Sequence, residues 1–204
     1  MSSAPAEQLV WIDCEMTGLE VPEDSIVEIA VIVTDFDLNL LDPGFSIVIN
    51  PGPEPIAHMG EFVTNMHRES GLLPLIEGGV TMSEAERQTI EYIDRFVPAG
   101  KRPLLAGNTI GMDRRFISEF MPALDERLHY RSIDVSTFKE LARRWYPSTY
   151  FSAPDKNGGH RALADIAESI RELAYYRSAV MIEGSGPTSS DAKRLASAAV
   201  EKFA

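Results

Sequence analysis

The apolar run Leu9-Val10-Trp11-Ile12 leads directly into two acidic residues, Asp13 and Glu15. Such a run predicts a buried strand. Side chains alternate between the two faces of a strand, so the carboxylates of residues 13 and 15 project from the same side. Neighbouring carboxylates repel each other unless a cation lies between them, and Mg²⁺ or Mn²⁺ suits such oxygen ligands best. The alternative is a strand end whose acids face water.

Three residues further along the chain, Asp113, His160 and Asp165, favour the metal-site interpretation. Asp113 follows a glycine-bounded turn at the start of an expected helix, where helix capping would also explain it. Asp165 borders the apolar face of a later helix. His160 precedes that helix, where the alternative is an ordinary surface histidine. Each of these signals is weak when taken alone.

Taken together, the four acids can neutralise two divalent ions, Mg²⁺ or Mn²⁺. Two ions ~3.5–4 Å apart can stabilise both the attacking and the leaving oxygen of an in-line phosphoryl displacement. A histidine, with an ordinary pKa near ~6.5, is suited to take a proton from the attacking water. The sequence therefore predicts a two-metal site for phosphodiester hydrolysis, with His160 as the general base.

The charge distribution limits what kind of nucleic acid such a site can bind. The formal net charge is −12, whereas affinity for a long nucleic acid backbone normally comes from Lys and Arg. Residues 1–100 carry 3 basic and 18 acidic groups, but residues 101–161 carry 11 basic and 7 acidic ones. A long nucleic-acid track is therefore not expected, and a compact phosphate site in 101–161 is allowed.

Length and cysteine content indicate a cytoplasmic protein with one main domain. A chain of 204 residues, 44% of them hydrophobic, can bury one core. Its single cysteine, Cys14, allows no internal disulfide, which suits a reducing compartment. The first eight residues lack the features of a signal peptide, and no apolar run approaches the ~20 residues needed to cross a bilayer. We therefore expect no membrane association.

The periodicity predicts an α/β fold, a mixed five-stranded sheet flanked by helices. The expected strands are 9–14, 26–33, 45–49, 103–107 and a short one near 131–134. Helical spacing predicts helices ending near Pro98, from about 113 to 121, after residue 134, and over a long stretch after residue 160. We expect a flexible N-terminus at 1–8, one catalytic domain at 9–181 and a flexible tail at 182–204.

The four acids and the histidine stand in the order typical of DEDDh exonucleases, and the chain resembles that group, whose fold is ribonuclease H-like. Within it the chain is similar to the oligoribonucleases through the stretches WIDCEMTGLE, GNTIGMDRRF, HYRSIDVSTFKELARRW and HRALADIAESIRELAYYR. The resemblance implies a 3′-to-5′ exoribonuclease that degrades very short RNA, especially dinucleotides, to 5′-mononucleotides. Alternatives are a DNA proofreading or repair exonuclease of the same group and a non-catalytic nucleic-acid-binding module.

The resemblance also implies contacts with the bases of the substrate. Leu19 would wedge between the two bases of a dinucleotide, and His67 would lie near the 3′ nucleotide. Phe62 stands where relatives carry Trp, which keeps an aromatic face for stacking. The alternative is that Leu19 and Phe62 are core residues.

At the other end of the substrate, the resemblance implies a cap on the 5′ phosphate and a homodimer. The matching cap residues are Thr109, Arg131, Ser136 and Thr137, although Ser136 or Thr137 could instead cap a helix. Tyr130 matches a catalytic tyrosine that reaches into the active site of a partner subunit.

Overall fold

The computed structural model describes residues 5–155, 159–184 and 186–203, and its centre is a five-stranded mixed sheet. The strand order is β3-β2-β1-β4-β5. β1 pairs antiparallel with β2 and parallel with β4, which confirms the predicted mixed sheet. The strands are β1 (Pro5–Met16), β2 (Ile26–Asp35), β3 (Phe45–Val48), β4 (Arg102–Gly107) and β5 (Ser132–Asp134).

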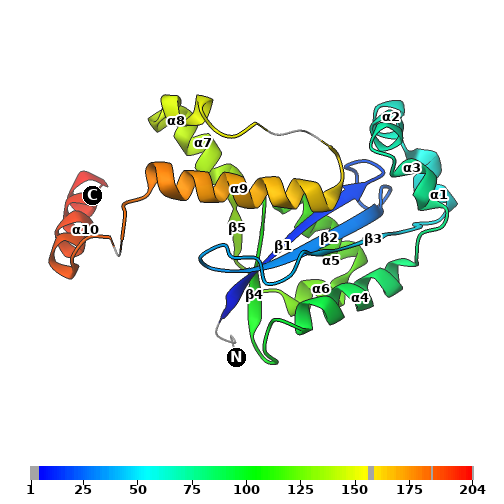
Figure 1. Cartoon of the computed structure of the whole chain (residues 1–204), viewed down its shortest axis with the longest axis horizontal. Coiled ribbons are helices and arrows are strands. Elements are labelled where there is room, and N and C mark those ends of the chain that lie inside the picture. Colours follow the sequence, from blue (N-terminus) through cyan, green and yellow to red (C-terminus); the bar gives the residue numbers. More distant parts are fainter. Residues whose placement is uncertain (1–4, 156–158, 185, 204) are drawn as a thin grey trace.

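Helices cover both faces of the sheet (Figure 1). α9 (Ala162–Val180) lies across one face, where its apolar residues pack with Leu9 and Trp11 of β1. α4 (Met82–Asp94), α5 (Gly111–Phe120) and α6 (Pro122–Arg127) cover the opposite face, and β1 presents Val10 and Ile12 to that side. This alternation along β1 is the period-two pattern of a strand buried on both faces.

Short helices fill stretches for which the sequence predicted no regular structure. Three lie between β3 and α4, namely α1 (Pro53–His58), α2 (Glu61–Glu69) and α3 (Leu73–Ile76). α8 (Pro147–Phe151) lies directly after α7 (Val135–Trp145). Each of the four is shorter than the ~12–15 residues that an isolated helix needs, so tertiary contacts hold them. In α2, for example, His67 is buried.

Both ends of the chain differ from the expectation. β1 begins at Pro5, so residues 5–8 belong to the sheet rather than to a flexible end, and Ala6 is buried. α10 (Ser189–Phe203) is a helix of 15 residues without a buried residue, inside the segment expected as a flexible tail. Residues 1–4, 185 and 204 of these two segments lie outside the described residues. The division into a domain at 9–181 and a separate tail stays a prediction.

Within the described ranges, no helix combines the length with the apolar character that crossing a membrane requires.

Candidate active site

Three carboxylates meet where β1 ends and α9 begins. Asp13 and Glu15 project from the same face of β1, as the period of a strand requires, and Asp165 comes from the first turn of α9. One oxygen from each lies within 4.8 Å of the others. The structure thus brings together three of the four predicted acids, although Asp165 follows Asp13 by 152 positions in the chain. Carboxylate oxygens at this spacing can hold a hard divalent cation.

Asp113, the fourth acid, lies behind this group rather than in it. It occupies the first turn of α5 and is buried, and its Oδ1 accepts a 3.0 Å hydrogen bond from the backbone amide of Cys14. Asp113 is therefore bonded to Cys14, the residue between Asp13 and Glu15. The helix N-cap is Ile110, so Asp113 is not the capping residue that its position alone allowed.

The pKa values of these acids show how strongly the site favours positive charge. Burial, and then the charges of Asp113, Glu15 and Asp165, raise the pKa of Asp13 to about 9. Burial and the neighbouring acids raise the pKa of Glu15 to about 7, and burial raises that of Asp113 to about 7. Such groups ionise readily only when a cation offsets their repulsion. The donor set therefore fits a divalent metal ion, which the structure does not contain.

The two histidines of the region lie in different surroundings. His160 is exposed, with a φ of 46°, a left-handed backbone conformation that is unusual outside glycine. It lies near enough to His67 for its charge to lower the pKa of His67, to which burial contributes most. His160 is not part of the close carboxylate group. Its role as general base stays a prediction.

His67 is fully buried beneath the end of β1. Its Nε2 lies 2.8 Å from the carbonyl oxygen of Met16, and because a carbonyl oxygen only accepts, Nε2 carries the proton. Its Nδ1 is 3.9 Å from Glu15 Oε2 and has no hydrogen-bond partner among the described residues. The ring therefore braces the strand end next to Glu15, and its implied contact with a 3′ nucleotide stays a prediction.

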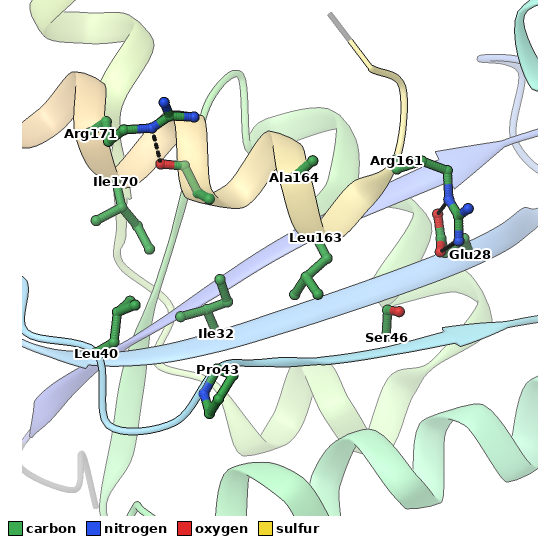
Figure 2. A pocket seen from close by; sticks show the side chains of 11 residues that line it. Glu28, Ile32, Leu40, Pro43, Ser46, Arg161, Leu163, Ala164, Ile170 and Arg171 are labelled. Atoms are coloured by element: carbon green, nitrogen blue, oxygen red, sulfur yellow. Dashed lines mark hydrogen bonds and ion pairs between the residues drawn. The ribbon is translucent and has the colours of Figure 1, made fainter. Parts of the chain in front are cut away.

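An ion pair fixes the start of α9. Glu28 of β2 is buried, and its carboxylate accepts hydrogen bonds from Arg161 at 2.9 and 3.2 Å and from the amide of Ala162 at 3.4 Å. Figure 2 shows the two side chains facing each other at one end of a groove between α9 and the sheet edge. Because Asp165 lies in the first turn of α9, this pair sets its position relative to β1.

The two apolar side chains implied in base binding are both exposed. Leu19, in the segment that joins β1 to β2, is 62% exposed, and Phe62, in the first turn of α2, is 80% exposed. The interpretation of these two as core residues is therefore wrong. Apolar side chains held in solvent are available to bind bases.

The implied phosphate-cap residues gather around Asp134. Its Oδ1 accepts hydrogen bonds from the amide of Thr109 at 3.0 Å and from the amide and hydroxyl of Ser136 at 2.9 and 2.6 Å. Asp134 is the N-cap of α7, so the capping role considered for Ser136 or Thr137 is wrong. Arg131 and Thr137 are exposed on the same short β5–α7 stretch. Their contact with phosphate stays a prediction.

Tyr130 projects from the surface just before β5. It is 69% exposed, its ring stacks on His129 at 4.4 Å between centroids, and the Arg131 guanidinium lies 5.4 Å from its ring centroid. Most of the Tyr130 side chain is therefore open to solvent within one chain. Its implied contact with a partner subunit stays a prediction.

Comparison with known proteins identifies the family. Residues 10–173 match the RNase T family, described as exonucleases. The chain is 57% identical to an oligoribonuclease of Leifsonia xyli subsp. xyli over 97% of this chain and 96% of that protein. It is 51% identical to one of Cutibacterium acnes over 92% of this chain and 93% of that protein. The chain belongs to the oligoribonuclease family of exonucleases.

Solved structures agree with this oligoribonuclease assignment at the level of the fold. Exonuclease I of Methylocaldum szegediense matches with a TM-score of 0.61 and 20% identity, over 84% of this chain and 40% of that one. Exonuclease I of E. coli, solved with single-stranded DNA, matches with a TM-score of 0.60 and 12% identity, over 85% and 41%. The chain spans about two fifths of the length of these enzymes. The ribonuclease H-like fold is confirmed.

Two supports of this oligoribonuclease site were missed from the sequence. Glu28 appeared as one member of an apolar strand, and Arg161 as one of several basic residues. A single acid inside the run Ile26-Val27-Glu28-Ile29-Ala30 was the available signal, because a buried carboxylate needs a partner. The role of Asp134 carried no comparable signal, since an acid before a helix is common.

Proposed function

We propose that this chain degrades very short RNA, dinucleotides above all, from the 3′ end and releases 5′-mononucleotides with the help of two divalent ions, Mg²⁺ or Mn²⁺. As a member of the oligoribonuclease family it is a 3′-to-5′ exoribonuclease that acts on short oligonucleotides. The observation that carries the proposal is the group of Asp13, Glu15 and Asp165, whose oxygens lie within 4.8 Å of one another.

In the proposed mechanism, Asp13, Glu15 and Asp165 would hold the cations, with the buried Asp113 adding negative charge behind them. When bound, such ions would supply positive charge for the phosphodiester in the transition state. His160, exposed beside the start of α9, takes a proton from the attacking water and returns it to solvent. The Glu28–Arg161 pair keeps α9, and with it Asp165, in place against the sheet.

The preference for very short RNA follows from groups at both ends of the proposed site. Leu19 and Phe62 offer apolar surface for two bases. Thr109, Arg131, Ser136 and Thr137 would hold the 5′ phosphate, with Arg131 as the charged donor. A closed cap admits a dinucleotide and excludes the continuation of a longer strand. The excess of basic residues in 101–161 supports this placement.

A homodimer and a cytoplasmic location are part of the proposal. The exposed Tyr130 would complete the site of a partner subunit across a two-fold interface, in which each chain contributes the same patch. The cytoplasmic location rests on the single cysteine, Cys14, which suits a reducing compartment.

The test is a comparison of initial rates on 5′-labelled RNAs of two to seven nucleotides and on DNA oligomers of the same sequences. We expect hydrolysis to require Mg²⁺ or Mn²⁺, to stop with chelator, and to be fastest on the RNA dinucleotide. Asp165→Asn, which keeps the side-chain shape, should nearly abolish hydrolysis. Equal rates at all RNA lengths would contradict the dinucleotide preference, and a preference for DNA would favour a repair exonuclease instead.

A further inference from the structure

The segment between β1 and β2, which carries Leu19, is tied down by one buried carboxylate. Asp24 is 3% exposed. Its Oδ1 accepts a 2.8 Å hydrogen bond from the hydroxyl of Thr17, and its Oδ2 accepts a 2.9 Å bond from the amide of Glu20. Asp24 therefore binds the residues on both sides of the Gly18-Leu19 pair. None of these contacts reaches the metal-binding acids.

The fit around this carboxylate is close. A Cβ placed at Gly18 would lie 2.2 Å from Asp24 Oδ2, so only glycine leaves room for the Asp24 carboxylate beside this residue. The Thr17 hydroxyl in turn accepts a 3.0 Å hydrogen bond from the amide of Ser25, and the Thr17 amide donates to the Ser25 carbonyl at 2.9 Å. These bonds close the base of the segment and leave Leu19 as its projecting, exposed side chain.

A second element joins the same carboxylate. His58, the last residue of α1, places Nδ1 3.1 Å from Asp24 Oδ1, and its side chain is 49% exposed. Only Met59 and Gly60 separate α1 from α2, which carries Phe62 in its first turn. In Figure 1, α1 and α2 lie beyond the end of the sheet at which β1 finishes. Asp24 thus links the support of Leu19 to the support of Phe62.

We propose that the Asp24–His58 contact is a specificity-determining clamp that sets the spacing between Leu19 and Phe62, and so the fit of two stacked bases. This inference rests on the proposed function, because it assigns the two apolar side chains to base binding. Asp24 and His58 act here as positioning residues and touch no substrate. A clamp of this kind lowers KM for substrates with two bases and leaves the chemical step unchanged.

The test compares kcat and KM of the wild-type chain and His58→Ala on two substrates. One is an RNA dinucleotide, and the other is a p-nitrophenyl ester of a nucleoside 5′-monophosphate, which has a single base. We expect KM for the dinucleotide to rise about threefold or more in the variant, in line with loss of one partly exposed ionic hydrogen bond. The dinucleotide kcat and both constants for the one-base ester should change less than about twofold.

Two further variants separate a clamp from general loosening of the fold. His58→Asn places an amide nitrogen near the former Nδ1 and should restore most of the dinucleotide KM. Arg95→Ala is the matched control. It removes a comparable contact, because the Arg95 guanidinium lies 3.2 Å from Asp42, a carboxylate that also anchors a turn. The Arg95–Asp42 pair has no part in the proposed base-binding site. This variant should leave KM unchanged.

A double-mutant cycle decides whether His58 acts through Leu19. If it does, His58→Ala should have no further effect on KM once Leu19→Ala is present. Additive effects, or an unchanged dinucleotide KM in His58→Ala, would overturn the clamp. Failure of the wild-type chain to hydrolyse the dinucleotide would instead overturn the proposed function, so the two failures are distinguishable.

Discussion

The backbone amide of Cys14 donates a 3.0 Å hydrogen bond to Asp113 Oδ1, which joins two residues 99 positions apart in the chain. This bond holds the first turn of α5 against the strand that carries Asp13 and Glu15. It also satisfies one lone pair of a buried carboxylate that is close to two others. The site is therefore held together by backbone structure while its charges repel one another, and a cation relieves that repulsion.

Removing one of the repelling charges should stabilise the metal-free protein. We expect Asp13→Asn to raise the free energy of unfolding in chelator at pH 8 by about 1–3 kcal/mol, because asparagine is neutral without taking up a proton. The same variant should lose most of the stabilisation that Mg²⁺ gives the wild type. Thermal melts with and without Mg²⁺ measure both effects, and a less stable metal-free variant would contradict the repulsion argument.

Stability of the metal-free protein should fall as pH rises from about 6 to 9. Burial raises the pKa of Asp13 to about 9 and those of Glu15 and Asp113 to about 7, above their ordinary values. A raised pKa means that the folded state binds more protons than the unfolded state, so stability is lost as pH rises through the folded pKa. Melting temperatures in chelator should show the slope, and saturating Mg²⁺ should flatten it. A melting temperature that does not change with pH in chelator would contradict the raised pKa values of these acids.

His160 is exposed and separate from the carboxylates, so its substitution should affect the rate and leave the metal site intact. We expect His160→Ala to lose roughly 10²–10⁴-fold in kcat, the usual contribution of a general base. Stabilisation by Mg²⁺ in a thermal melt should remain near that of the wild type. A rate loss below about threefold would mean that His160 takes no proton in the rate-limiting step.

Arg131 provides the test of the 5′-phosphate cap. Its exposed guanidinium should bind a terminal phosphate through charge-assisted hydrogen bonds that contribute about 1.5–3 kcal/mol. We therefore expect Arg131→Ala to reduce kcat/KM sharply for a 5′-phosphorylated dinucleotide and much less for RNAs of five to seven nucleotides. Arg95→Ala serves as the matched basic control. An equal loss at every length would argue against a cap at this position.

Tyr130 should act on the active site of a second subunit. Asp13→Ala and Tyr130→Ala homodimers are each expected to be inactive, the first in its metal site and the second in the contributed tyrosine. In a mixed dimer, one of the two sites regains both an intact carboxylate group and a partner tyrosine, so partial activity should return. Subunit exchange is verified with two affinity tags. Verified mixed dimers that stay inactive would remove Tyr130 from the neighbouring site.

The local sequence pattern was sufficient to predict the strands and to predict that Asp13 and Glu15 lie on the same face of one strand. The apolar run Leu9–Ile12 predicted a buried strand, and the two-residue period of a strand then placed Asp13 and Glu15 on one face. The start of α4 is equally local, because the Thr81 side chain accepts a hydrogen bond from the Glu84 amide three residues later. The order of acids and histidine sufficed for the family resemblance. The strands and the start of α4 depend only on neighbours within a few residues.

Only the tertiary structure decided which distant groups meet. Leu19 and Phe62 have the large apolar side chains typical of a core, yet both are exposed. His67 and Glu28 are polar, yet both are buried. Whether a side chain is buried depends on the elements that pack over it, and local periodicity carries no information about them. Glu28 is tolerated inside the protein because Arg161, 133 residues later, reaches it. The supports of the site are thus properties of the folded chain.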